Sequence, residues 1–383
     1  RALLYLNHAL DLLDPERDDL IYTYLLSDKG IALIETHELK AAQETLSKAQ
    51  QLAQELHHPI EGDILLNLAK VAQGTGNPGQ SESLVKEALR IYEKDSLTQE
   101  MAIAHQALGG YTALQGKTEA ARRHYQIALD LEKGNKGSFK GRQRGKILAA
   151  FAEFEAAQQD PTHALKLYQE AIQTVVPSFV PQSQTSLPDD SLLYEENLIY
   201  ESLLGMAEVF EKIYTTTSEV DYLLQALEAR EKVMRVEDLL RGRFAYEGPK
   251  LQLQAERHAR TGKLLKLVSQ LSEVLPDQYI FYLDKAFQYL ERNKALVMEE
   301  ESRRAQAIQR SANSEAYQQL NRQITDLQNA RIEAKEGPER DSLQRALNKI
   351  KLEEARLVDP INAFFSQQQD ANQRIQLDLI DLQ

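Results

Sequence analysis

Bulky apolar residues recur every three or four positions along most of this chain, which is the period of helices that bury one face. Within that pattern a small residue stands seven positions before another, with a bulky residue four positions after the first. The copies are Ala2/Leu6/Ala9, Ala42/Leu46/Ala49, Ser81/Val85/Ala88, Ala121/Tyr125/Ala128 and Ala164/Tyr168/Ala171. Successive copies begin 40, 39, 40 and 43 residues apart. A fixed period in this range predicts an α-solenoid.

Another small residue stands twelve positions before copies two to five. These residues are Gly30, Ala69, Gly109 and Ala152. Bulky residues lie three and four positions around each of them, so every repeat is predicted to be a pair of helices, A and B. Small side chains allow helix axes to approach to about 8–10 Å. We therefore expect Gly30 to face Ala42 within one repeat, and Ala49 to admit helix A of the next repeat.

These spacings resemble the tetratricopeptide (TPR) repeat, which has a small residue at position 8, Ala at 20, a bulky or aromatic residue at 24 and Ala at 27. The usual TPR unit has 34 residues, whereas the period here is about 40. The longer unit resembles the repeats attached to bacterial caspase-like CHAT proteins. The resemblance implies an all-α, TPR-like superhelix of helix-turn-helix repeats.

Two later segments, 240–247 and 285–296, resemble the last repeat of the bacterial TPR-CHAT proteins. They are followed by apolar residues at helical spacing on both sides of Gly337-Pro338. The first stripe is Tyr317, Leu320, Ile324, Leu327 and Ala334, and the second is Leu343, Leu347, Ile350 and Leu357. This pattern predicts a long antiparallel helical hairpin. By resemblance, a caspase-like peptidase domain would follow it, outside the present chain.

The sequence divides into four segments by regularity. Residues 1–177 carry the regular repeats, and 178–191 form a linker loop within a stretch rich in Pro, Ser and Gln. Residues 192–300 carry longer, degenerate repeats, with Ala207 and Ala226 at positions 8 and 20 of a sixth unit. Residues 301–383 are predicted to form the hairpin and a connector to a missing domain.

Composition narrows the class of protein. The chain of 383 residues has a formal net charge of −13 and no cysteine. The charge disfavours general binding to nucleic acid or anionic membranes, so nucleic acid is expected as an indirect partner at most. Without cysteine there is no disulfide, thiolate nucleophile or cysteine-based zinc site. No stretch approaches the length of a membrane span, and we expect a cytoplasmic protein without a membrane partner.

The sequence contains no convincing motif for catalysis, cofactor binding or metal binding. The string Gly74-Thr75-Gly76-Asn77-Pro78-Gly79 matches a dinucleotide pattern, but a predicted helix precedes it and Pro interrupts it, which indicates a turn between helices. None of the eight histidines stands at the spacing of a helical metal motif. No G-x-S-x-G elbow is present. We predict a non-enzyme, with no catalytic residue, cofactor or metal.

A TPR-like array presents helix A of each unit on a concave face, where a segment of another protein can lie. Mapping the family's inward positions onto this sequence gives the candidate partner-binding groove. Its residues are Tyr24, Ile31, Ile34, Leu66, Lys70, Ile103, Gln106 and Glu153. Ile31, Ile34, Leu66 and Ile103 are the expected anchors for an apolar helix or for a piece of the same protein.

One local feature opposes the global charge. The stretch 134–145 is interpreted as a Gly-rich basic loop with Lys136, Lys140, Arg142 and Arg144. Two interpretations stay open: a contact for an acidic protein surface or RNA, and a solvated flexible loop.

The sequence therefore predicts a non-catalytic protein-interaction module. By resemblance, it is the recognition and regulatory part of a TPR-CHAT peptidase, which captures a protein partner or a large effector complex and controls the attached or cognate protease. The alternative is a stand-alone TPR adaptor that scaffolds a multiprotein complex and has no protease.

Overall fold

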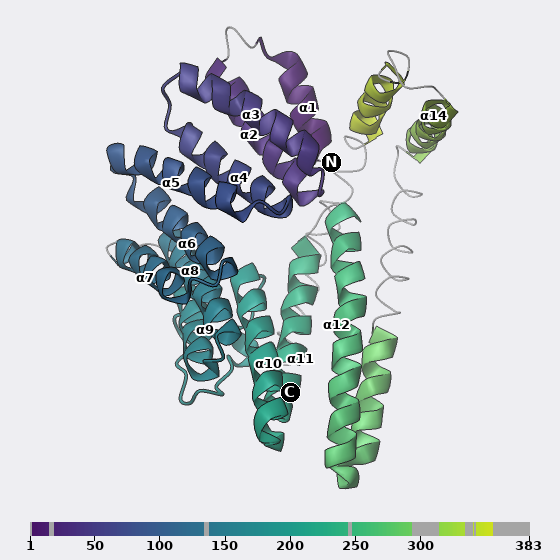
Figure 1. Cartoon of the computed structure of the whole chain (residues 1–383). Coiled ribbons are helices and arrows are strands. Elements are labelled where there is room, and N and C mark those ends of the chain that lie inside the picture. The colour runs from purple at the N-terminus through teal and green to yellow at the C-terminus, as the bar shows by residue number, and fades with distance from the viewer. Residues whose placement is uncertain are drawn as a thin grey trace. The chain divides into compact units, whose positions relative to one another are not determined.

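The computed structural model describes residues 2–14, 19–133, 138–243, 247–292, 314–333, 340 and 342–354 (Figure 1). Every regular element in this part of the chain is helical. The predicted fold class, an all-α TPR-like solenoid followed by a helical hairpin, is confirmed. Within the described residues, no helix combines the length and the apolar character needed to cross a bilayer.

Among the described residues, nine helices cover the regular repeats. They are α1 (Ala2–Leu12), α2 (Asp19–Glu35), α3 (Leu39–Glu55), α4 (Ile60–Gly74), α5 (Pro78–Lys94), α6 (Thr98–Leu114), α7 (Thr118–Glu132), α8 (Ser138–Ala157) and α9 (Pro161–Val175). Each predicted A helix packs on its B helix in the pairs α2/α3, α4/α5, α6/α7 and α8/α9. The residues predicted to form a sixth unit lie in α10 (Asn197–Thr217) and in the first part of α11 (Val220–Arg243).

The small residues of copies two to five are all buried, as predicted. In α4/α5 the two positions touch, because Ser81 Oγ donates a hydrogen bond of 2.9 Å to the carbonyl oxygen of Ala69. A Cβ on Gly30 would lie 2.4 Å from Leu46 Cδ2. Gly30, at position 8, therefore also leaves room for the side chain of Leu46, at position 24. These contacts explain why both positions recur together.

The first copy differs from the others. Ala2 is exposed and Ala9 is half-buried. In the described residues α1 packs chiefly on α2, so no second neighbour closes over its small positions. The first copy therefore has the same three-residue pattern as the others, but its small residues are not fully buried.

A long loop connects α9 to α10 and includes the residues 178–191. It contains one short 3₁₀ helix, η1 (Asp190–Leu192). The Gln169 amide donates hydrogen bonds to the carbonyl oxygens of Ser183, Gln184 and Ser186 at 2.9, 3.2 and 3.0 Å. One buried side chain thus fastens the loop to α9.

The chain divides into two compact units, residues 1–233 and 234–383. The segment boundaries predicted at 177, 191 and 300 stay predictions. In the second unit, α12 (Glu247–Val274) is joined through η2 (Pro276–Gln278) to a helix over 279–292. The short connection turns the chain back, so the two helices run antiparallel.

Both arms of the predicted hairpin are helical, over α14 (Ser314–Glu333) and over 342–354. Leu347 and Leu352 are buried, and Tyr317, Leu320, Ile324 and Leu327 are half-buried. The turn at Gly337-Pro338 lies outside the described residues, as do Ala334 and Leu357.

Candidate protein-interaction surface

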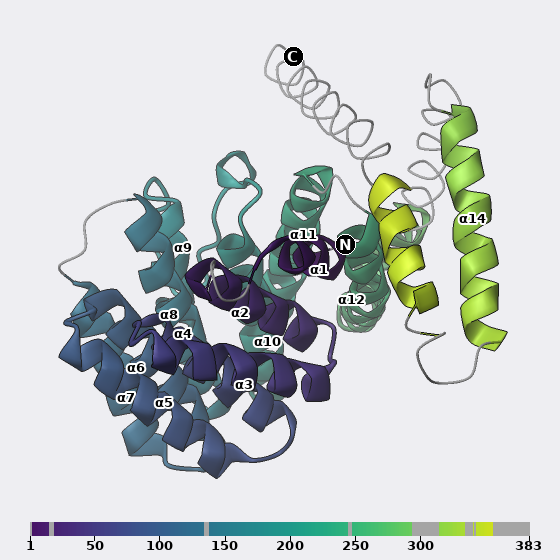
Figure 2. The same ribbon diagram turned by 90° about the horizontal axis from the view of Figure 1, so that it is seen from above.

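The A helices form the inner side of the solenoid in the first unit. α2 contacts α4, α6 contacts α8, and α8 contacts α10. Figure 2 shows α3, α5 and α7 along the outer edge of the stack, with α2, α4 and α8 further in. Helices that touch their counterparts in the next repeat lie on the shorter side of a curve. The predicted groove residues therefore lie on helices of the inner side, and their role in binding stays a prediction.

Of the predicted groove residues, the most exposed apolar ones lie on α2. Tyr24 is 45% exposed and Ile31 is 37% exposed. Ile21 joins them at 56%, although the mapping from family positions did not select it. It lies three residues before Tyr24 and ten before Ile31, so helical spacing alone would have placed it on the same face.

The other predicted anchors are less accessible. Ile34 packs against the core formed by the first helices, and Leu66 packs against the next core cluster. Ile103 is also half-buried. Their side chains contribute to stacking between repeats and leave only part of their surface for a partner.

Three polar groove residues differ in their surroundings. Lys70 is exposed, and its Nζ donates to Asn67 Oδ1 at 3.4 Å. Gln106 is half-buried and accepts a hydrogen bond of 3.3 Å from Gln143 Nε2, which links α6 to α8. Glu153 is exposed. Desolvation raises the pKa of Glu201, and the negative charge of Glu153 is a further cause. The positive charge of Lys146 on α8 lowers the same pKa, so this end of the A helices carries charges of both signs.

The interpretation of 134–145 as a loop was wrong for its second half, because α8 begins at Ser138. The glycines there are sites of close approach. A Cβ on Gly141 would lie 2.9 Å from the carbonyl oxygen of Thr174, and one on Gly145 would lie 2.3 Å from Leu198 Cδ2. The glycines suggested a flexible loop in the sequence. In the structure they allow α8 to pack closely against its neighbours, because glycine has no side chain to keep the helices apart.

Two basic residues of this stretch have partners within the fold. Arg142 pairs with Glu196 at the start of α10, and Arg144 Nη1 donates to the carbonyl oxygen of Leu129 at 2.9 Å. Lys136 lies outside the described residues, and Lys140 belongs to the first turn of α8, where side chains are not described. A role in binding acidic protein or RNA stays a prediction.

The tertiary structure brings together His105 of α6 and His124 of α7, which sequence spacing did not connect. Their Nδ1 atoms lie 3.0 Å apart, and their ring centroids are separated by 5.3 Å. The nitrogens therefore point at each other, as in a hydrogen bond from one neutral ring to the other. Burial lowers the pKa of His105 to about 4, and burial also lowers the pKa of His124. Both shifts favour the neutral form of the ring.

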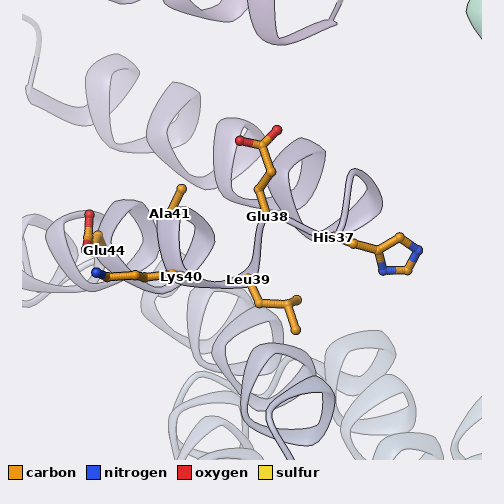
Figure 3. Close-up of a pocket in the computed structure, with 6 residues that line it drawn as sticks. All are labelled: His37, Glu38, Leu39, Lys40, Ala41 and Glu44. Carbon is orange, nitrogen blue, oxygen red and sulfur yellow. The ribbon is translucent and has the colours of Figure 1, made fainter. Parts of the chain in front are cut away.

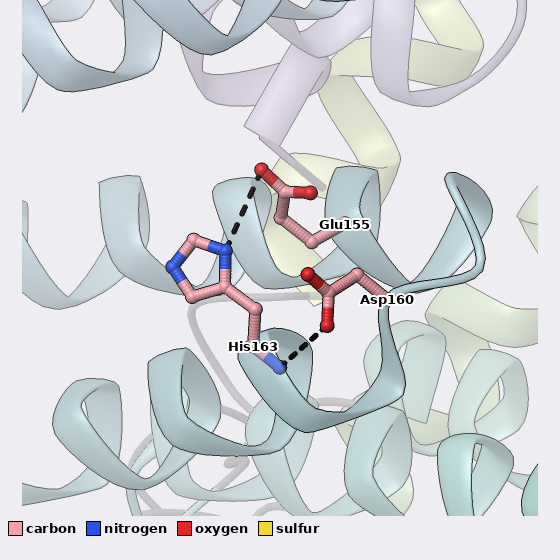
Figure 4. Close-up of side chains that lie close together, drawn as sticks. All are labelled: Glu155, Asp160 and His163. Carbon is pink, nitrogen blue, oxygen red and sulfur yellow. Dashed lines mark hydrogen bonds and ion pairs between the residues drawn. The ribbon is translucent and has the colours of Figure 1, made fainter.

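A second cluster consists of Glu155, Asp160 and His163, whose ligand-type atoms lie within 4.8 Å of one another (Figure 4). Arg122 Nε and Nη2 each donate to the buried Glu155 carboxylate at 2.8 Å. Asp160 Oδ1 accepts the His163 backbone N–H at 3.0 Å and caps α9. Arg122 already neutralises Glu155, and Asp160 already caps the helix. This arrangement is therefore suited to an internal ion pair more than to a metal.

A surface hollow lies at the turn between α2 and α3 (Figure 3). It is lined by His37, Glu38, Leu39, Lys40, Ala41 and Glu44. All six residues come from one turn and the helix that follows it. A small-molecule site needs groups that converge from several elements, so this hollow is a poor candidate for one.

The comparisons with known proteins agree with the repeat pattern. Residues 21–94 match the model of the tetratricopeptide repeat. This segment contains most of α2 and all of α3 to α5, the two pairs in which the Gly30/Leu46 and Ala69/Ser81 contacts were found. No curated protein sequence matches the chain.

Several solved structures are similar to the chain at low identity. BtubC (BKLC) from P. vanneervenii is 14% identical with a TM-score of 0.45, over 62% of this chain and 87% of that protein. The apo quorum sensor NprR from B. thuringiensis is 15% identical with a TM-score of 0.43, over 77% and 80%. A Rap protein complexed with Competence and Sporulation Factor is 12% identical with a TM-score of 0.46, over 76% and 80%.

Proposed function

We propose that the chain is a non-catalytic protein-interaction module that binds an apolar segment of a partner along the inner face of its repeats. The observation that carries this proposal is the exposure of Ile21, Tyr24 and Ile31 on α2. Contiguous apolar patches on a protein surface often mark sites of protein interaction. The half-buried Leu66 and Ile103 extend the apolar track to α4 and α6.

The chemistry of the face suggests how a partner is bound. Apolar side chains on α2 supply burial of about 1.5–3 kcal/mol for each one that becomes fully covered. An amphipathic helix, or an extended segment with apolar side chains, fits such a face.

A finer proposal concerns the larger protein. The segments 240–247 and 285–296 resemble the closing repeat of TPR-CHAT proteins. On that resemblance the module is the regulatory part of a caspase-like peptidase, and partner binding changes the attached or cognate protease. The coding sequence beyond Gln383 tests this, because a peptidase requires a catalytic Cys and His there or on a neighbouring gene. A stand-alone adaptor would have neither.

The binding proposal is tested by affinity capture with the whole chain and two variants. Tyr24→Asp/Ile31→Asp places charge on the inner face. Val180→Asp, at an exposed apolar residue of the loop after α9, is the matched control. Quantitative mass spectrometry should show partners that are lost with the double variant and retained with the control. All three chains should have the same helical content and melting temperature.

Recovered partners are then titrated directly against the purified chains. We expect at least about a tenfold loss of affinity for the double variant, which corresponds to about 1.4 kcal/mol. Equal binding by the double variant and the unmodified chain would contradict the proposal that the partner binds the inner face. The proposal of a peptidase attachment would be unaffected by that result.

A further inference from the structure

The rings of His105 on α6 and His124 on α7 meet head-on. Their Nδ1 atoms lie 3.0 Å apart, and their ring centroids lie 5.3 Å apart. The difference of about 2.3 Å is twice the distance from the centre of an imidazole ring to one of its atoms. Both ring centres and both nitrogens therefore lie close to one line, and the two Nδ1 atoms are aimed at each other along it.

This contact offers a metal ion two ligand atoms. Among the described residues, three ligand atoms of His, Cys, Asp or Glu converge within 4.8 Å at only one place, formed by Glu155, Asp160 and His163. Zn²⁺ takes four ligands in structural sites and three protein ligands in catalytic sites, and its bonds meet at tetrahedral angles. Such an ion would have to lie beside the line that joins the two nitrogens. A zinc site therefore fits the histidine pair poorly.

The charges around the pair also disfavour a divalent ion. Burial is the main cause of the lowered pKa of His124, and the positive charges of Lys86 and Arg123 lower it further. The Glu82 carboxylate acts in the opposite direction. However, its oxygens lie 2.6 Å from Lys86 Nζ and 3.3 Å from Lys117 Nζ, so two ammonium groups already share its charge. An ion with a single positive charge is repelled least in these surroundings.

We propose that His105 and His124 bind one monovalent copper ion, Cu⁺, through their Nδ1 atoms in a linear two-coordinate arrangement. Imidazole is a suitable ligand for copper, and monovalent ions with a filled d shell, such as Cu⁺ and Ag⁺, accept two collinear ligands. Two metal–nitrogen bonds of about 2 Å each place the nitrogens about 4 Å apart, so the rings must separate by about 1 Å. Both rings are only half-buried, which leaves room for this movement.

Binding leaves the number of protons on the pair unchanged. In the hydrogen-bonded pair of neutral rings, one ring carries its proton on Nδ1 and the other carries its proton on Nε2. Coordination needs the lone pairs of both Nδ1 atoms, so the first ring gives up its Nδ1 proton to water and takes one on its own Nε2. The chain has no cysteine, so no thiolate competes with the two imidazoles for a soft ion.

This site is separate from the proposed partner-binding face. None of the predicted groove residues is a ligand, although Ile103 and Gln106 stand next to His105 in the sequence of α6. The outcome of the experiments below therefore leaves the proposal for the inner face unaffected, and the reverse also holds.

The first experiment uses Ag⁺, an air-stable probe, in nitrate buffer without chloride. The unmodified chain is labelled with ¹⁵N in its histidines, and its nitrogen resonances are followed by NMR during the titration. One equivalent of Ag⁺ should shift the Nδ1 resonances of His105 and His124 more than any other histidine nitrogen. Largest shifts at Nε2 atoms, or at other histidines, would overturn the proposal.

The second experiment measures the affinity for Cu⁺, kept reduced with ascorbate, by competition with the chelator bicinchoninate. His105→Gln and His124→Gln should each weaken binding by more than about 100-fold, because even residues that only orient a metal ligand contribute about 10–100-fold. His163→Gln, at a histidine whose Nδ1 lies 3.6 Å from Glu155, is the control and should bind as the unmodified chain does. Circular dichroism should show the same helical content for all four chains.

Two results of these titrations would contradict the site. Equal Cu⁺ binding by His105→Gln and the unmodified chain would show that the pair is not the ligand set. Loss of binding in His163→Gln alone would assign the ion to the cluster of Glu155, Asp160 and His163. A parallel titration with Zn²⁺ tests the choice of ion, and we expect its affinity to be at least about tenfold lower than that of Cu⁺. An equal affinity for Zn²⁺ that both histidine variants lose would overturn the linear monovalent site.

Discussion

Ser81 and Ala69 lie twelve residues apart, and the hydroxyl of the first donates a hydrogen bond of 2.9 Å to the carbonyl oxygen of the second. Ala42, Ala121 and Ala164 occupy the place of Ser81 in three other repeats, and all are buried. The position therefore tolerates a methyl group or a small hydroxyl in direct contact with the facing helix.

Two substitutions of Ser81 measure the contributions of the hydrogen bond and of the close packing separately. Ser81→Ala should lower the free energy of unfolding by about 1 kcal/mol, because the side chain still fits and only the hydrogen bond is lost. Ser81→Leu should lower it by about 3 kcal/mol or more, because the facing helix must move. Urea denaturation measures both. Similar effects of the two variants would contradict the close contact.

Adjacent glycines on α6 should respond in opposite directions to Ala. A Cβ on Gly109 would lie 3.0 Å from three atoms of the Tyr125 ring, whereas one on Gly110 would meet only Tyr125 Oη at 3.8 Å. Tyr125 cannot move away easily, because its ring stacks on Phe151 with centroids 5.1 Å apart.

We therefore expect Gly109→Ala to destabilise the chain by about 1–2 kcal/mol through overpacking. Gly110→Ala should stabilise it by about 0.5–1 kcal/mol, because Ala loses less backbone entropy in a helix. Thermal unfolding of the two variants compares them under identical conditions. Stabilisation by Gly109→Ala would show that Tyr125 yields freely.

The ion pair of Arg122 and Glu155 should be sensitive to loss of one partner. Glu155 is fully buried and receives two hydrogen bonds from the guanidinium. Hydrogen bonding to Glu155 raises the pKa of Arg122. Arg122→Met should cost about 3 kcal/mol, because a buried carboxylate then lacks its counterion.

The double variant Arg122→Met/Glu155→Met should recover part of that loss, because no buried charge is left unpaired. Chemical denaturation of the single and double variants gives the coupling between the two sites. Additive effects would indicate that Arg122 stabilises the fold through its stem alone. Added Zn²⁺ should leave the melting temperature of the unmodified chain unchanged if the cluster acts as an ion pair.

The histidine pair of α6 and α7 predicts a loss of stability in mild acid. Burial lowers the pKa of His105 to about 4, below the ordinary value of 6.5. The unfolded chain therefore binds more protons than the folded chain between these values, and stability falls as the pH drops from about 6.5 towards 4. The partial exposure of both rings limits the effect to the order of 1 kcal/mol.

His105→Gln/His124→Gln should reduce this pH dependence, because neither amide titrates. Melting temperatures at pH 7.5 and 4.5 make the comparison, and His37→Gln, at an exposed histidine in a turn, is the control. An unchanged pH dependence in the double variant would assign the acid sensitivity to other groups. Nitrogen chemical shifts of the two rings would report which Nδ1 carries the proton.

Much of the repeat architecture could be predicted from spacing. Gly30, Ala69, Gly109 and Ala152 recur twelve residues before the next small residue, and each is buried. The pattern is visible because every repeat must solve the same packing problem with residues close in sequence. The same logic correctly indicated a turn at Gly76, which has a φ of +81° and follows α4.

The sequence pattern was misleading at glycines, because a glycine can mark either a flexible loop or a close contact between helices. Gly141 and Gly145 suggested a loop, yet they lie in α8 against Thr174 and Leu198. A glycine that permits flexibility and one that permits close approach are identical in the sequence. The difference depends on what packs against it, and here that partner lies roughly 30 or more residues away.

By itself, the sequence determined the helical repeats, their pairing and the residues at their closest contacts, because local periodicity and side-chain size are sufficient for these. The tertiary structure decided which apolar residues stay exposed, which charges find partners and which histidines meet. The exposure of Ile21 and the contact between His105 and His124 depend on which side chains other helices supply. Such neighbours follow from three-dimensional packing and leave no fixed spacing along the chain.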